Sequence, residues 1–221
     1  MNNLEALTWR LIRVTGADRI IYLQGQLTQD IATGGQHRSL VLQPSGEVIS
    51  DLEVISQKDF IDLVVPELVA DVVLARLRRF LLRADVQFSE LRVASPVNNL
   101  ARLIESSWPS AYEWRLALPP HSFGKVVVDA TVSFSKGCFT GQELVGRADA
   151  RNATMPWRFL TGRGGSIDEV TALLKAAGPE GPQGVTSQYS LNGTEHWRGV
   201  AHRSFDPSTL TTTGAELTYF A

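Results

Sequence analysis

The run of eight residues from Lys136 to Glu143 gathers several kinds of reactive and hydrogen-bonding groups in one short segment. It contains an ammonium group, a thiol, an amide, a carboxylate and two glycines, at Lys136, Cys138, Gln142, Glu143, Gly137 and Gly141. Glycine lets the backbone adopt a positive φ or approach a ligand closely, and Gln142 with Glu143 could bond the donor-rich edge of a heterocycle such as a pterin. The run therefore predicts either a ligand-binding turn or an ordinary surface turn with a buried thiol.

Cys138 is the single cysteine of the sequence, so the chain cannot form an internal disulfide. Lys136 or Arg147 would favour a reactive thiolate if either approached the thiol, which makes Cys138 a candidate catalytic residue. A buried, inert thiol is the alternative. One cysteine and four widely separated histidines do not have the spacing of metal ligands, so the sequence predicts no metal site.

Composition narrows the class of protein. The chain has 221 residues, of which 43% are hydrophobic, and a net charge of −2. The hydrophobic content predicts a globular protein, and the slightly negative net charge predicts no general affinity for nucleic acid. We also expect a cytoplasmic protein without a membrane partner, because the N-terminus lacks a basic and apolar leader and charged residues interrupt each apolar stretch.

The periodicity of apolar residues predicts strands and helices that mix without strict alternation, which is an α+β fold. We expect a strand from Trp9, an antiparallel meander from Ser39 to Val65 and a helix after Pro66. The stretch from Val126 to Phe134 has a strand-like pattern, and residues 98–105 have a helical one. A further helix and several strands follow residue 151, which suits a small barrel or sandwich.

The segment Lys-Gly-Cys, an aromatic residue, any residue, Gly-Gln-Glu resembles the signature of the YgfZ-like folate-binding proteins, which are relatives of the glycine-cleavage T-protein. Further segments are similar to this family in the same order, so that nearly the whole chain is matched: Val14–Asp18, Tyr22–Asp30, Gln43–Glu47, Arg79–Arg83 and Gly184–Ser187. The match is weakest from Ala94 to Thr131.

The resemblance implies a T-protein-like fold, with mixed α/β modules around a central hole for folate and a small C-terminal β-barrel. It implies three parts: an N-terminal folate-binding module (1–95), a second module with the signature (96–150) and the barrel (151–221). Tetrahydrofolate or a derivative is the implied cofactor. The implied folate-binding residues are Trp9, Trp114, Lys136, Gly137, Cys138, Gln142, Glu143 and Arg147. The two tryptophans offer flat faces for the ligand, although core aromatics are the alternative.

The implied role is that of an accessory protein that supports the assembly or repair of iron–sulfur enzymes, and through them tRNA modification, with folate and iron–sulfur proteins as partners. A folate-dependent aminomethyltransferase is the first alternative. T-proteins usually carry paired aspartates where this chain has Ser50 and Asp51, and Asp51 is therefore the second candidate catalytic residue. The chain lacks their Gly-Tyr-Thr-Gly-Glu element, which disfavours that reaction. A non-catalytic interaction scaffold is the second alternative.

A cluster of arginines at positions 76, 78, 79 and 83 follows the pattern of the helix predicted after Pro66. It could bind the glutamate tail of folate or a nucleic-acid phosphate. A solvated helix face is the alternative, and the acidic balance of the whole chain favours it.

Overall fold

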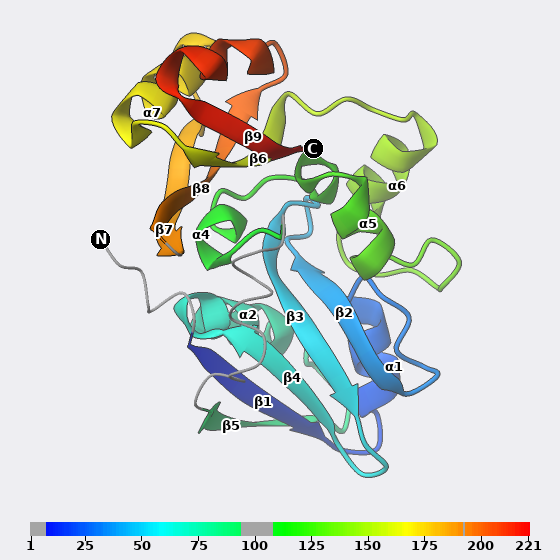
Figure 1. The fold of residues 1–221 in the computed structure, drawn as a ribbon. Helices are drawn as coiled ribbons and strands as arrows, with labels where there is room; N and C mark the ends of the chain where they lie inside the picture. The colour runs from blue at the N-terminus through cyan, green and yellow to red at the C-terminus, as the bar shows by residue number, and fades with distance from the viewer. Residues whose placement is uncertain (1–7, 94–107, 192) are drawn as a thin grey trace.

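A computed structural model describes residues 8–93, 108–191 and 193–221 (Figure 1). The first part of the chain forms a five-stranded antiparallel sheet of β1 (Trp9–Thr15), β2 (Gly35–Leu42), β3 (Val48–Ser56), β4 (Ile61–Pro66) and β5 (Gln87–Val93). The strand order is β2-β3-β4-β1-β5, which confirms the predicted meander and the α+β class.

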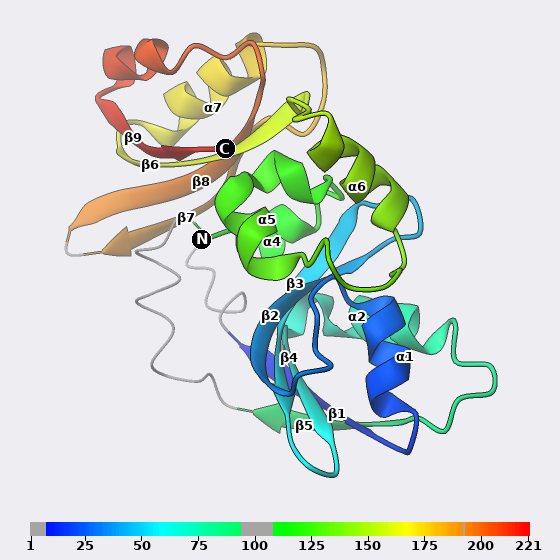
Figure 2. The same cartoon turned by 90° about the vertical axis from the view of Figure 1, so that its right-hand side faces the viewer.

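Two helices, α1 (Arg19–Gln26) and α2 (Glu67–Arg78), cover one face of this sheet (Figure 2). Five apolar residues of α2 recur at helical spacing and are buried against the sheet, at positions 69, 70, 73, 74 and 77, whereas Val72 is exposed. They meet the inward side chains of the strands in a first core cluster that includes Ile12, Leu52, Leu63 and Val73. The hydroxyl of Tyr22 on α1 donates a hydrogen bond to the carbonyl of Leu77, which joins the two helices.

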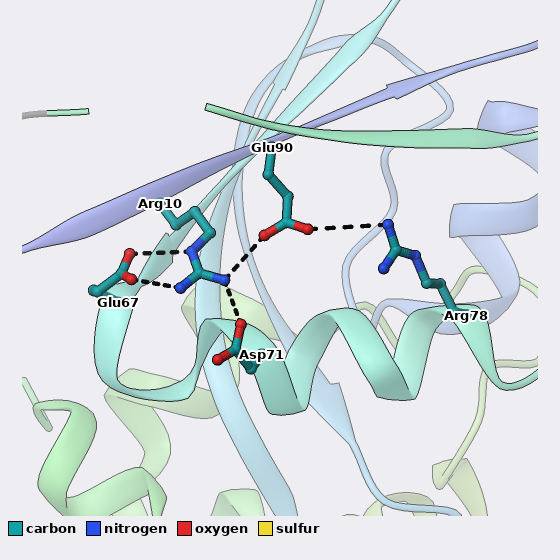
Figure 3. A network of polar contacts seen from close by, with 5 residues as sticks. All are labelled: Arg10, Glu67, Asp71, Arg78 and Glu90. Atoms are coloured by element: carbon teal, nitrogen blue, oxygen red, sulfur yellow. Dashed lines mark hydrogen bonds and ion pairs between the residues drawn. The ribbon is translucent and has the colours of Figure 1, made fainter. Parts of the chain in front are cut away.

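A network of charges fastens α2 to the edge of the sheet (Figure 3). The guanidinium of Arg10 on β1 pairs with Glu67 and Asp71 of α2 and with Glu90 of β5. Glu90 also lies 4.0 Å from Arg78. Hydrogen bonds to Glu67 and then to Asp71 raise the pKa of Arg10, so this buried guanidinium stays charged.

The middle of the chain is helical. It contains α4 (Ala111–Trp114), a 3-10 helix (Pro120–Phe123), α5 (Lys125–Thr131) and α6 (Gln142–Ala150). The strand-like reading of Val126 to Phe134 is wrong, because this segment begins as α5. Its consecutive valines favour a strand locally, but Val127 and Val128 are buried on one side of a helix against the core. The helix predicted at 98–105 lies outside the described residues.

The last part of the chain forms a second antiparallel sheet of β6 (Trp157–Gly164), β7 (Gly184–Leu191), β8 (Thr194–His202) and β9 (Ala215–Phe220). Its order is β7-β8-β6-β9, and α7 (Ile167–Ala176) packs on it. The order begins and ends at an edge strand, so closure into a barrel stays a prediction.

One core cluster joins all three parts of the chain. It combines Leu40 and Leu42 of β2 with Trp114 and Phe123 of the helical middle and with Phe159 of β6. The predicted division at 95 and 96 lies outside the described residues, and the division into modules stays a prediction. Among the residues that the structure describes, no helix is long and apolar enough to cross a membrane.

Candidate functional site

The signature run forms a turn that is tied to the end of α1. The ammonium of Lys136 donates hydrogen bonds of 2.8, 2.8 and 2.9 Å to the carbonyl oxygens of Gln24, Leu27 and Gln29. A helix end leaves such carbonyls without intrahelical partners, so Lys136 satisfies them. Burial lowers the pKa of Lys136 to about 8, against the opposing effect of Asp30. These contacts hold the chain in place, and the role of Lys136 in folate binding stays a prediction.

The second half of the turn packs on the hairpin between β2 and β3. Gly141 has a φ of 84° and Gly46 has a φ of 100°, a region that glycine adopts without strain. A Cβ added at Gly141 would lie 2.7 Å from the carbonyl oxygen of Gln43 and 3.2 Å from the Cα of Gly46. The glycines therefore let two backbones meet. A Cβ added at Gly137 would meet open space, so packing does not require glycine at this position.

The remaining signature residues face outward or bond locally. Cys138 is a free, exposed thiol. The side-chain oxygen of Gln142 lies 3.4 Å from the amide nitrogen of Phe139 and accepts its hydrogen bond. Glu143 pairs with Arg147 one turn later on the exposed face of α6. The alternative of a buried thiol at Cys138 is therefore wrong. Folate contacts of these four side chains, and a catalytic role for Cys138, stay predictions.

A buried carboxylate lies at the centre of the molecule, where β3 meets α4. Asp51 is only 4% exposed, and its Oδ2 accepts a hydrogen bond of 2.8 Å from the indole nitrogen of Trp108. The indole nitrogen of Trp114, which is buried without a hydrogen-bond partner, approaches the same carboxylate but does not reach hydrogen-bond geometry. The guanidinium of Arg38 lies 4.2 Å from the centre of the Trp108 ring.

Burial raises the pKa of Asp51, because removing water disfavours the ionised form. The charge of Arg38 opposes this most strongly, and the hydrogen bond from Trp108 acts in the same direction as Arg38. The Asp51 carboxyl group is thus buried, with the indole rings of Trp108 and Trp114 and the guanidinium of Arg38 near it. Such a group can hold a proton or accept a hydrogen bond from a polar ligand.

Of the two tryptophans predicted to bind folate, only Trp114 lies near the candidate catalytic residue Asp51. Trp114 lies beside Asp51, and it also shares a core cluster with Phe139 of the signature. Trp9 begins β1 opposite Pro66 and Val93 and is half-buried. None of the core clusters formed by the described residues includes Trp9. Its contact with folate stays a prediction.

Trp108 and Arg38 also belong to the site, although neither is among the candidate residues predicted from the sequence. No local pattern marks them, because 57 positions separate Trp108 from Asp51. The structure describes no group of three histidine, cysteine, aspartate or glutamate side chains that could hold a metal ion, within residues 8–93, 108–191 and 193–221.

Comparison with solved structures defines the class of fold. The glycine cleavage system aminomethyltransferase T from Bartonella henselae superposes with a TM-score of 0.55 at 13% sequence identity, covering 88% of this chain and 76% of that one. The chain therefore has an α+β fold of the aminomethyltransferase T type. At this identity the likeness concerns the fold alone.

Sequence comparison then gives the nearer resemblance. No family model matches the chain. The tRNA-modifying protein YgfZ of Enterobacter sp. (strain 638) is 25% identical, covering 73% of this chain and 72% of that protein. The protein of the same name from Yersinia enterocolitica is 28% identical, covering 75% of this chain and 71% of that protein. The predicted resemblance to the YgfZ-like proteins is thereby confirmed.

Proposed function

We propose that this protein binds tetrahydrofolate or a related folate at Asp51 and acts as an accessory protein in tRNA modification. In this role it supports the assembly or repair of iron–sulfur enzymes in the cytoplasm. The observation that carries the proposal is the buried Asp51 between Trp108 and Trp114, within a fold of the aminomethyltransferase T type. The relatives named as tRNA-modifying proteins support the biological setting.

The chemistry of the site suits a flat, polar heterocycle. A reduced pterin carries amino and ring N–H donors along one edge, and the carboxylate of Asp51 can accept them. The indole nitrogen of Trp114 is a buried donor with no partner, and such a group gains most from a ligand acceptor. Indole rings also supply stacking surface, which adds about 0.5 to 1.5 kcal/mol beyond the area buried.

Titration of tetrahydrofolate against tryptophan emission tests the proposal. We expect saturable quenching in the wild type and an affinity at least about tenfold weaker in Asp51→Ala, the loss of one charge-assisted hydrogen bond. Trp114→Phe keeps the ring but removes the donor and should weaken binding, and Trp9→Ala tests the other predicted tryptophan. Trp197→Phe is the matched control, because Trp197 belongs to the separate core cluster of the second sheet. Absence of saturable quenching would contradict folate binding.

A folate-dependent one-carbon transfer is the second candidate. The pKa of Asp51, raised by burial, favours it, since a carboxyl group that binds its proton more tightly than usual is better suited to exchange that proton with a bound amine. The assay is the formation of methylene-tetrahydrofolate from an aminomethylated carrier protein. Turnover that is lost in Asp51→Asn supports the transferase. Folate binding without turnover supports the accessory role.

A further inference from the structure

Arg76 of α2 is a buried cation outside the site at Asp51. The residue is 5% exposed. Its Nε donates to the carbonyl oxygen of Leu42 at 2.9 Å, and its Nη1 donates to the side-chain oxygen of Gln26 at 3.0 Å. The Nη2 group is buried and has no hydrogen-bond partner among residues 8–93, 108–191 and 193–221. Both partners are neutral oxygens, so two of the three guanidinium nitrogens are bonded and the charge itself is not balanced.

The charged groups that face Arg76 do not include a carboxylate among the described residues. Tyr22 of α1 and Arg79 are the groups that act on it, and Arg79 carries the same charge. Arg10 of β1 shows the contrast, because its guanidinium pairs with three carboxylates. A buried charge without a counter-charge destabilises the fold, and it is retained where a ligand or partner supplies the balance.

A partly exposed aromatic side chain lies over one face of the Arg76 guanidinium. The ring of Phe80 lies 4.7 Å from the guanidinium carbon, and this phenylalanine is 41% exposed. Arg79 lies 5.9 Å from the same ring and is itself exposed at the surface. Displacement of one aromatic side chain would thus open the guanidinium to solvent. Arg79 would attract an anion to this point and offset the negative end of the helix dipole.

Arg76 and Asp51 lie on opposite faces of the first sheet. Asp51 is paired with Leu40, whose side chain belongs to the core cluster of the two tryptophans. Arg76 projects from α2, whose apolar residues fill the core cluster on the other face. A ligand group at Arg76 would therefore occupy a second position, distinct from the proposed heterocycle site.

We propose that the Nη2 group of Arg76 is the binding point for an oxyanion, a carboxylate or phosphate group of a small molecule, which enters where the ring of Phe80 now lies. The Nη2 group carries N–H donors that none of the described residues accepts, and a charged N–H donor suits such an oxygen. The chemistry of the ligand group is set by the charge and the free donor. The inference does not depend on folate binding.

Thermal unfolding with inorganic phosphate, against chloride at equal ionic strength, tests the proposal. We expect the unfolding temperature of the wild type to rise saturably with phosphate, since a ligand that binds only the folded state stabilises it by mass action. Arg76→Gln should weaken the apparent affinity about tenfold or more, the loss of a charge-assisted bond. Phe80→Ala should show the same response at lower phosphate concentration.

Arg163→Gln is the matched control, because it removes an exposed arginine paired with Glu216 in the second sheet and should respond as the wild type does. If Arg76→Gln fails to fold, Arg76→Lys keeps the charge and removes Nη2, and its response should weaken in the same direction. An unsaturable response in the wild type, or an equal response in the Arg76 variants, would overturn the proposal.

A second arm identifies the source of the oxyanion. Tetrahydrofolate and tetrahydropteroate, which lacks the glutamate carboxylates, are compared in the wild type and in Arg76→Gln. If the wild type prefers the glutamate form and the variant does not, the oxyanion belongs to the folate tail. If neither pterin compound binds while phosphate still does, the proposed folate function fails and the oxyanion site stands.

Discussion

Asp51, which is buried, and Lys136, which is partly buried, are accommodated in different ways. The ammonium of Lys136 meets three carbonyl oxygens, so all of its donors are used and its cost is largely offset. The carboxylate of Asp51 receives one strong hydrogen bond and the more distant charge of Arg38. Lys136 therefore resembles a structural group, and Asp51 resembles a group kept for a ligand or reaction at some cost to stability.

Asp51→Asn should leave stability at pH 7 unchanged or higher. The folded pKa of Asp51 is raised above its ordinary value of 3.8, so the folded state binds the proton more tightly than the unfolded state. The stabilisation that Asp51 contributes is present below pH 3.8 and is lost as pH rises from 3.8 through the higher pKa of the folded state. Urea unfolding between pH 4 and 8 should show a flatter pH dependence in the variant. Asp129→Asn, an exposed control, should follow the wild type, and a less stable Asp51→Asn at pH 7 would contradict the interpretation.

Lys136→Met should destabilise the protein by about 1 to 3 kcal/mol, because partly buried carbonyls lose their donor. Lys125→Met is a suitable control, since Lys125 is exposed and pairs only one turn along α5 with Asp129. Urea unfolding of both variants at pH 7 measures the difference. Equal losses in the two variants would show that the contacts of Lys136 do not hold the turn.

The signature turn and the hairpin of β2 and β3 are two elements whose backbones pack in direct contact. Gly141 and Gly46 approach so closely that each leaves no room for a side chain. The hydroxyl and amide groups of Thr140 bond to the carbonyl of Gly25 on α1, so the turn is anchored to two elements. The identity of these residues thus reflects packing as well as any contact with a ligand.

Gly141→Ala should cost about 1 to 2 kcal/mol for the positive φ alone, and more because the new methyl group meets the carbonyl of Gln43. Gly137→Ala lies in the same motif and should be tolerated, because a Cβ there meets open space. Thermal unfolding of the pair checks the prediction. An equal effect at the two glycines would mean that the turn rearranges freely on the hairpin.

At the scale of the whole molecule, a few buried polar contacts join the helical middle to the second sheet. The carboxylate of Glu113 on α4 accepts hydrogen bonds from Thr186 and Ser187 of β7, and it also bonds Ser110 at the start of its own helix. The guanidinium of Arg198 on β8 donates to the carbonyl of Trp108 at 3.0 Å. The same tryptophan donates to Asp51, so the second sheet helps to position the candidate site.

Glu113→Ala should destabilise the protein by about 1 to 3 kcal/mol, because the hydroxyl groups of Thr186 and Ser187 lose their acceptor. The amides of β7 and β8 should then exchange with solvent faster than those of the first sheet. Hydrogen exchange followed by mass spectrometry measures both. Glu195→Ala, an exposed change on β8, should leave the exchange pattern as it is; uniform acceleration in Glu113→Ala would argue against a local joint.

The sequence predicts this protein best where the signal is local. The meander, α2 and the signature turn follow from short-range periodicity and turn residues. The segment from Val126 was misassigned because β-branched residues favour strands unless tertiary packing selects a helix. Asp51 could be singled out by resemblance, but its contacts with Trp108 and Arg38 could not, since they depend on how distant elements meet. The unpaired Nη2 of Arg76 could be found only from the fold, although the arginine cluster pointed to the region.

The exposed thiol of Cys138 offers a practical point of attachment. It is the single cysteine in the sequence, so a maleimide dye or a spin label would react at one known position. The turn that carries it is held on one side by Lys136 and on the other by the contact of Gly141 with the hairpin. A label there would share the motion of the first sheet. With a second label at a cysteine introduced in the second sheet, the distance between the two would report on movement of one sheet relative to the other.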